Sequence, residues 1–350
     1  LPGGAEGEPE ASPQAATRGR AEAAGDAEQD EQETADHAGP GESDVTALPD
    51  EGGALDRQAE VVPLDDFPRG AEAGTFMHAV FEELARGPGF RDADEARVRE
   101  VVREQRDFYG LHPRWEDPFA RAVERILDTP LGGIPGGAVR DGPTLRALPK
   151  GDCLAELAFC FPALGGLEAS ARGETVHPAA LARAFRAGGT GDLPAGYAGS
   201  VERLGFAGFR GFLKGVIDLV FRWSSTGRPG DGHWYVLDYK SNRLLAGREQ
   251  EKSLFGDYAR PRLDSAMAHH DYILQYHLYA VAVHRHLAWR LGERYDYERD
   301  FGGVYYLFVR GMQGPDPAGD TGVYRCRPPF ERIRALADLF DGPGRPGEAD

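Results

Sequence analysis

Apolar residues recur at helical spacing in five stretches of the chain. The predicted helices cover residues 74–84, 93–109, 118–129, 178–186 and 271–291. In the first of them the apolar face consists of Met77, Val80, Phe81 and Leu84. Thr75 is expected to be its N-cap, because a threonine hydroxyl accepts a hydrogen bond from a free N–H group of the first turn. Residues 132–149 are rich in Gly and Pro, which predicts a loop.

Shorter apolar runs rich in β-branched and aromatic residues predict strands at 154–161, 211–223, 234–240 and 301–310. A turn rich in Gly, Ser and Pro separates the second strand from the third, so these two are expected to form a β-hairpin. One charged residue, Asp218, interrupts the apolar second strand.

Alternation along the hairpin predicts which side chains share a face. On the second strand one face would carry Lys214, Val216, Asp218 and Val220, and the other Leu213, Ile217, Leu219 and Phe221. On the third strand Val236, Asp238 and Lys240 would lie opposite Tyr235, Leu237 and Tyr239. We therefore expect Asp218, Asp238 and Lys240 to meet across one face of the hairpin.

Charge is distributed unevenly. Residues 1–60 hold 16 acidic residues, 3 arginines and no aromatic residue, so they contribute −13 of the formal net charge of −17. Such a segment cannot bury enough apolar surface to offset the entropy of ordering, and we predict a disordered acidic tail or linker. One large folded domain is expected over 61–340, with a flexible tail at 341–350. The folded part is nearly neutral, so its net charge does not indicate what it binds.

The cysteines and apolar runs restrict the setting of the protein. Cys153, Cys160 and Cys326 are odd in number and lack CxxC spacing, which favours neither a disulfide framework nor a four-cysteine cluster. There is no run of about 18 apolar residues and no signal-peptide pattern at the start. We expect a soluble cytoplasmic protein without a membrane segment. A chain that begins at Leu1 within linker-like sequence is expected to be part of a longer protein.

The charged residues of the hairpin suggest metal chemistry. Burying them costs several kcal/mol each unless they are paired or bind a metal. Hard carboxylate oxygens suit Mg²⁺ or Mn²⁺, and a metal-bound water can attack phosphorus. The alternative is an Asp–Lys ion pair without a catalytic role. The chain has 36 Arg and only 4 Lys, so Lys240 and Lys214 are expected to have a specific purpose.

Four further residues are candidates, each with an ordinary alternative. His78 lies beside an apolar helical face and would supply a nitrogen ligand or simply pack. Glu156 lies in the middle of a strand, where an acid either acts or faces solvent. Gln275 and Tyr279 are one helical turn apart, and Gln275 would hold a phosphate or orient water, or the pair would simply belong to an amphipathic helix. Five histidines nearby lack carboxylates at zinc-site spacing, so no zinc site is predicted: His269, His270, His277, His284 and His286.

Five motifs, in order over residues 61–340, resemble the C-terminal nuclease domain of RecB, the beta subunit of exodeoxyribonuclease V. They are Gly-Thr-Phe-Met-His-Ala-Val-Phe-Glu (74–82), Leu-Lys-Gly-Val-Ile-Asp-Leu-Val-Phe (213–221), Leu-Asp-Tyr-Lys-Ser-Asn (237–242), Gln-Tyr-His-Leu-Tyr (275–279) and Phe-Gly-Gly-Val-Tyr-Tyr-Leu-Phe-Val-Arg-Gly (301–311). The resemblance implies an α/β fold of the PD-(D/E)xK superfamily, with a restriction-endonuclease-like core in which helices flank a mixed central sheet.

The resemblance also implies roles for site residues. It makes His78, Asp218, Asp238 and the backbone carbonyl of Tyr239 ligands of one Mg²⁺ ion, and Lys240 catalytic. Glu156 matches the additional acid of the family, and Gln275 and Tyr279 match its QxxxY element. The implied activity is Mg²⁺-dependent hydrolysis of linear single- and double-stranded DNA in break repair and recombination.

The chain lacks one motif of the full subunit and one feature of some related nucleases. It has no G-x-x-x-x-G-K-[ST] phosphate loop, so no ATP site is predicted in it, and a covalently linked helicase domain and RecC- and RecD-like subunits would supply unwinding. Three scattered cysteines predict no iron–sulfur cluster. The acidic segment would be the tether to the motor.

Two other functions stay open. The chain could be a catalytically silent nuclease-like scaffold or DNA-binding module, or a stand-alone endonuclease that cuts specific sites. For DNA contact the sequence predicts a local basic funnel near Lys214, Arg210 and Arg243.

Overall fold

The computed structural model describes residues 58–135, 142–163, 176–206, 208–228, 231–245, 252–315 and 320–341. Most of the acidic segment 1–60 and all but the first residue of the tail 341–350 lie outside the described residues.

A five-stranded sheet forms the centre of the fold. Its strands are β1 (Cys153–Ala163), β2 (Gly211–Trp223), β3 (His233–Lys240), β4 (Phe301–Phe308) and β5 (Val323–Cys326). They lie in the sheet in the order in which they occur in the chain. Neighbours are antiparallel except β3 and β4, which are parallel because the chain crosses back through a helical connection between them.

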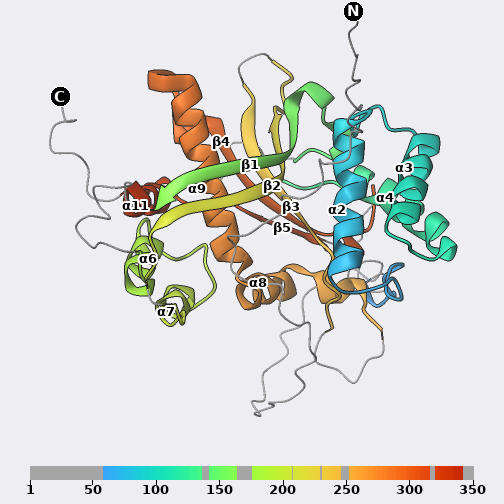
Figure 1. Cartoon of the computed structure of the whole chain (residues 1–350), viewed down its shortest axis with the longest axis horizontal. Coiled ribbons are helices and arrows are strands. Elements are labelled where there is room, and N and C mark those ends of the chain that lie inside the picture. Colours follow the sequence, from blue (N-terminus) through green and yellow to red (C-terminus); the bar gives the residue numbers. More distant parts are fainter. Residues whose placement is uncertain are drawn as a thin grey trace, which may run out of the picture.

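Helices cover both faces of the sheet (Figure 1). They are α2 (Ala71–Arg86), α3 (Glu95–Phe108), α4 (Glu116–Asp128), α6 (Pro178–Arg186), α7 (Tyr197–Glu202), α8 (Arg260–His269), α9 (Tyr272–Leu291), α10 (Tyr297–Asp300) and α11 (Phe330–Asp341). Short 3-10 helices lie at Pro113–Trp115, Leu145–Ala147, Lys150–Asp152, Phe255–Tyr258, Gly292–Arg294 and Val309–Gly311. The predicted mixed α/β architecture, a mixed sheet flanked by helices, is confirmed.

Two hydrophobic cores lie on the two faces of the sheet. The first, here called the α2 core, joins α2, α3 and α4 to alternate residues of the strands, among them Phe81, Leu219, Leu237 and Tyr239. The second, the α9 core, joins α6, α8, α9 and α11 to the other strand residues, among them Ile217, Val220, Val236 and Tyr306. A mutation in a strand therefore affects the helical layer on the side to which the mutated side chain points.

The predicted elements agree with the structure in most places. The hairpin of β2 and β3 is confirmed, and the predicted helix 178–186 and strand 211–223 coincide with α6 and β2. Thr75 is not an N-cap: α2 begins at Ala71 after Gly70, and the Thr75 hydroxyl donates to the carbonyl of Ala71 instead. The last predicted strand ends at Phe308, and its last two residues lie in a 3-10 helix.

The predicted alternation along β2 is wrong at its centre. Ile217 packs in the α9 core whereas Leu219 packs in the α2 core, although two residues so spaced in a regular strand share a face. On β1 the partner residues Leu157 and Ala155 are divided in the same way. Between those two lies Glu156, whose φ of 51° is in the left-handed region. The pleat of both strands therefore changes sides at one level of the sheet, the level of Glu156 and its neighbour on β2.

No helix in the described ranges is long and apolar enough to span a membrane. The three cysteines are all free thiols.

Candidate active site

The candidate site begins where β2 and β3 separate. The two strands are paired from Trp223 and His233 as far as Leu219 and Leu237, and the register ends there. One residue further on, the Asp218 carboxylate accepts a hydrogen bond from the backbone N–H of Tyr239, with an O–N distance of 2.8 Å. A side chain thus takes the place of the next strand hydrogen bond, and it holds Asp218 in the opening between the strands.

Helix α2 brings His78 to this opening. Its Nδ1 lies 3.1 Å from Oδ2 of Asp218. The Tyr239 ring stacks on Phe81 of the same helix at a centroid distance of 4.4 Å, which fixes the height of α2 over the strand. Burial alone would raise the pKa of Asp218, but His78 and the Tyr239 N–H outweigh burial and lower it. Burial opposes a charged His78, yet Asp218 raises the pKa of this imidazole.

Asp238 and Lys240 form an ion pair on the other side of the opening. Nζ of Lys240 lies 2.8 Å from Oδ2 of Asp238, and only 3% of the Asp238 side chain and 11% of the Lys240 side chain are exposed. Burial raises the pKa of the Asp238 carboxyl to about 6, although Lys240 opposes this shift. Burial would lower the pKa of Lys240, but Asp238 and its other neighbours raise it, so the lysine is charged.

Helix α9 supplies a polar network to this pair. Lys240 Nζ also lies 3.0 Å from Oε1 of Gln275, to which the Tyr306 hydroxyl donates as well, at 3.0 Å. Nε2 of Gln275 donates to the Tyr279 hydroxyl at 3.0 Å, as the predicted one-turn spacing allows. Gln275 therefore links the lysine of β3 to Tyr306 of β4 and to its own helix.

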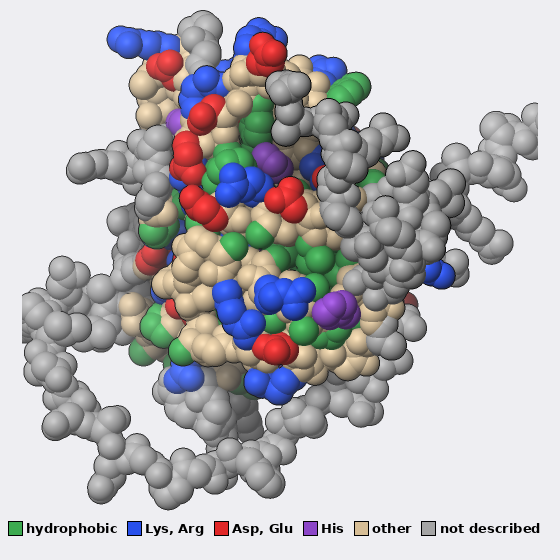
Figure 2. All heavy atoms as spheres, turned by 90° about the vertical axis from the view of Figure 1, so that its left-hand side faces the viewer, with side chains coloured by type: hydrophobic (Ala, Val, Ile, Leu, Met, Phe, Trp, Pro, Cys, Tyr) green, Lys and Arg blue, Asp and Glu red, His purple; other side chains and the backbone are tan. Residues whose placement is uncertain are grey.

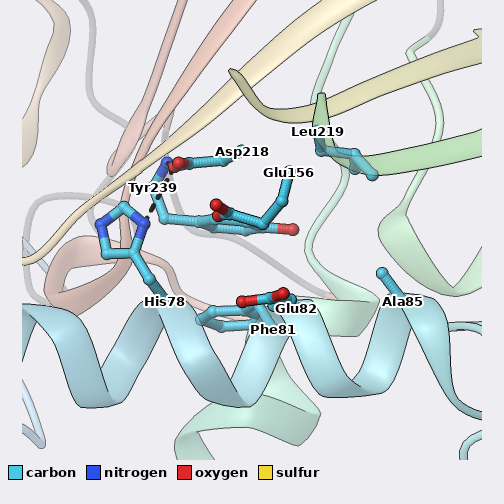
Figure 3. A pocket seen from close by; sticks show the side chains of 8 residues that line it. All are labelled: His78, Phe81, Glu82, Ala85, Glu156, Asp218, Leu219 and Tyr239. Carbon is cyan, nitrogen blue, oxygen red and sulfur yellow. Dashed lines mark hydrogen bonds and ion pairs between the residues drawn. The ribbon is translucent and has the colours of Figure 1, made fainter. Parts of the chain in front are cut away.

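Glu156 reaches the site from β1 (Figure 3). It lines a hollow between α2 and the strands together with His78, Phe81, Glu82, Ala85, Asp218, Leu219 and Tyr239. In Figure 3 the carboxylates of Glu156, Glu82 and Asp218 all extend into this hollow. Asp238, Lys240, Gln275 and Tyr279 do not line it. The predicted residues therefore converge from both helical layers on the strand opening, and not on one face of the hairpin as alternation predicts.

The donors at this opening fit a hard divalent cation in their chemistry. His78 Nδ1 and Asp238 Oδ2 are buried and have no hydrogen-bond partner among the described residues, although each lies beside an opposite charge. Carboxylate oxygens are the ligands that Mg²⁺ prefers. Within the described residues, however, no three His, Cys, Asp or Glu side chains converge closely enough to hold a metal as they stand. Asp218 faces His78 and Asp238 faces Lys240, so these charges neutralise one another.

Two tyrosines contact the candidate lysine although the sequence analysis assigns them no role. The ring centroid of Tyr272 lies 3.9 Å from Lys240 Nζ, and that of Tyr306 lies 5.2 Å from it. Tyr272 is three residues before Gln275 on α9, so helical spacing was a signal that could have identified it. Tyr306 lies in a continuous apolar strand, where nothing in the sequence distinguishes it from its neighbours.

Comparison with known proteins extends the match beyond the motifs. No protein family model matches the chain. The RecBCD enzyme subunit RecB of Escherichia coli K12 is 34% identical to it over 276 residues, which are 79% of this chain and 20% of that subunit. The RecB subunit of Mycobacterium tuberculosis H37Rv is 37% identical over 310 residues, 85% of this chain and 26% of its own length. The RecB subunit of Haemophilus influenzae is 32% identical over 275 residues, 79% of this chain and 19% of the subunit.

This chain thus spans about a fifth to a quarter of the length of the curated relatives that it matches. The chain is therefore a homologue of part of the RecB subunit of RecBCD enzymes.

Proposed function

We propose that this chain hydrolyses phosphodiester bonds of DNA with a divalent metal ion, as the nuclease part of a RecBCD-type helicase-nuclease that acts in double-strand-break repair and recombination. The observation that carries the proposal is that two largely buried pairs of opposite charge, His78 with Asp218 and Lys240 with Asp238, lie at the opening between β2 and β3. The naming of its relatives as RecBCD subunits supports it.

In this proposal one Mg²⁺ ion is held by His78, Asp218, Asp238 and the backbone carbonyl of Tyr239, with Mn²⁺ as a substitute. When bound, the ion activates water and withdraws charge from the phosphate. The Asp238 carboxylate, which pairs with Lys240, would be one of the oxygen ligands. Lys240 keeps its hydrogen bond to Gln275 and donates another to a phosphate oxygen, where negative charge develops. Glu156 extends into the hollow, where it would accept a proton from the attacking water or orient that water.

The silent-scaffold alternative is less well supported. Asp238 and Lys240 are nearly fully buried charges. Replacing such a pair by two well-packed apolar residues often leaves the stability of a protein unchanged or increases it. A module without catalysis has no need to keep them. A stand-alone endonuclease would cut at defined sites, whereas the proposed exonuclease-type activity degrades linear DNA without sequence preference.

The proposed partners follow from the same relatives. A RecBCD enzyme has further subunits, so we propose RecC- and RecD-like partners and, in the full-length protein, a covalently linked helicase domain. No ATP site is proposed in this chain. A cytoplasmic location is proposed because such an enzyme acts on chromosomal DNA.

The basic funnel predicted for DNA needs one change. Arg243 is paired with Asp65 at 2.7 Å and only 7% of its side chain is exposed, so it supports the fold and does not face DNA. Lys214 and Arg210 are exposed beside β2. Basic side chains also gather in the lower half of Figure 2. Helix α6 lies on that side of the molecule (Figure 1). Its Arg186 is paired with Glu202, and neither residue lines the hollow shown in Figure 3, so this helix is not part of the candidate site. We therefore propose that DNA approaches along β2.

The test uses linear single- and double-stranded DNA with the purified chain in Mg²⁺ or EDTA. Wild type is expected to degrade DNA in Mg²⁺ only, and Asp238→Asn and Lys240→Gln to lose at least about 100-fold in kcat, the scale of a removed charge-stabilising group. The exposed variants Asp92→Asn and Lys252→Gln are matched controls and should keep full activity. A folded wild type that cleaves neither substrate, or cleavage that survives in both site variants, would contradict the proposal.

A further inference from the structure

The catalytic lysine candidate is enclosed by two aromatic rings as well as by two oxygens. Lys240 Nζ lies 2.8 Å from Asp238 Oδ2 and 3.0 Å from Gln275 Oε1. The Tyr272 ring lies 3.9 Å from it and the Tyr306 ring 5.2 Å. An ammonium has three N–H groups, so one can donate to Gln275 Oε1 and another can point to the face of Tyr272, while its charge pairs with Asp238.

Both rings are anchored by hydrogen bonds of their own. The Tyr272 hydroxyl donates to Oδ1 of Asn242 at 3.1 Å, and Asn242 follows Lys240 by two residues in the chain. The Tyr306 hydroxyl donates to Gln275 Oε1, the same atom that accepts from Lys240. The two ring centroids are 6.0 Å apart. The rings and the lysine therefore have a common set of anchors, and a shift of either ring moves the ammonium.

We propose that Tyr272 and Tyr306 are positioning residues, which hold the Lys240 ammonium between Asp238 and Gln275 for the phosphodiester hydrolysis proposed above. The proposal rests on that function. A lysine has four rotatable side-chain bonds and would otherwise adopt several conformations. The faces of the two rings attract its charge and hold the ammonium in one position beside Gln275, from which it would donate to a phosphate oxygen.

The first test is a kinetic cycle on single-stranded DNA. Tyr272→Leu is expected to lower kcat about 2- to 30-fold, the range of a cation–π contact, with KM unchanged. Tyr272→Phe keeps the ring and should recover most of the loss, and Trp289→Leu, an exposed aromatic on the same helix, should have no effect. In the Lys240→Gln background Tyr272→Leu should cause no further loss in kcat. A loss of equal size in that background, or an equal loss in Tyr272→Phe, would overturn the positioning role.

The second test does not depend on cleavage. The chain has four lysines, so selective ¹³C labelling gives four Cε–Hε signals, and Lys240→Gln identifies the one from Lys240. A ring face over the end of the side chain shifts that signal upfield. Tyr272→Leu should return it toward the other three, while Tyr272→Phe should leave it shifted. An unshifted Lys240 signal in wild type would overturn the inference even if DNA is cleaved; a shifted signal without cleavage would support the enclosure and contradict the nuclease.

Discussion

Glu156 has a left-handed backbone in the middle of β1, with a φ of 51°. A residue with a Cβ pays about 1–2 kcal/mol for this conformation, and strands rarely contain it. The conformation lets Glu156 and Ala155 lie toward the same side of the sheet, so the carboxylate reaches the hollow beside His78. Strain is thus located at the residue where the site requires a particular direction of the side chain.

We expect Glu156→Gly to be more stable to unfolding than Glu156→Ala, by about 1 kcal/mol, because only glycine adopts this backbone without cost. Both variants lack the carboxylate and should lose activity alike. Urea unfolding of the two proteins measures the difference. An alanine variant as stable as the glycine variant would mean that Glu156 is not strained.

At the residue scale the sequence predicts the charged members of the site better than the uncharged ones. His78, Asp218, Asp238 and Lys240 stand out because a charge in an apolar run costs free energy unless it has a purpose. Tyr306 does not stand out, since an aromatic residue in a buried strand is ordinary. Its contact with Lys240 depends on the parallel pairing of β3 with β4, which no local pattern contains.

The outer half of β2 is the element that extends from the site into solvent. Phe212 and Val216 are 64% and 41% exposed, and Lys214 between them is exposed as well. Leu213 and Ile217, which each follow one of these two apolar residues, pack in the α9 core on the other face. The exposed side chains therefore follow one face of β2 toward Asp218. Apolar and basic groups in alternation suit a single nucleic-acid strand, whose bases stack while its phosphates are neutralised.

We expect Phe212→Ala and Lys214→Gln each to weaken binding of single-stranded DNA, measured by fluorescence anisotropy in EDTA, where nothing is cleaved. Loss of a stacking ring costs about 1–3 kcal/mol. Loss of the lysine should also lower the salt dependence of binding by about one ion. Phe108→Ala and Arg290→Gln, on exposed positions of α3 and α9, are the matched controls. Equal binding by all four variants would show that β2 does not contact single-stranded DNA.

At the element scale most long helices and strands follow from periodicity, but the change of sides in β1 and β2 does not. Alternation assumes a regular pleat, and the left-handed Glu156 breaks it. Helices α8 and α11 and strand β5 also escape the sequence patterns. Strand β5 is only four residues long, and α8 has a weak apolar periodicity.

For the molecule as a whole, acid stability depends on histidines buried without charge. Burial, together with Arg332, lowers the pKa of His277 to about 3, and burial lowers that of His284 to about 4. His277 packs against the Phe185 ring, and Asp192 pairs with Arg332 beside it. In the unfolded chain both imidazoles have a pKa near 6.5, so between pH 6.5 and 4 the unfolded chain binds more protons than the folded chain does. Stability is therefore fully present above about pH 6.5 and falls as the pH drops toward 4.

We expect His277→Gln, which is neutral at every pH, to flatten this dependence. Between pH 6.5 and 5 wild type should lose about 1.5 kcal/mol more of its free energy of unfolding than the variant. Urea unfolding at several pH values gives both slopes. Parallel slopes would show that His277 is charged in the folded protein.

The order of the strands in the sheet, which is their order in the chain, determines when the site becomes complete during folding. β1, β2 and β3 form an antiparallel meander, so Asp218, Asp238 and Lys240 come together through contacts close in sequence. Gln275 and Tyr306 join them only after the long crossover through α8 and α9 has docked β4. A growing chain therefore brings both carboxylates together early, whereas Tyr272, Gln275 and Tyr306 reach Lys240 only when α9 and β4 have docked.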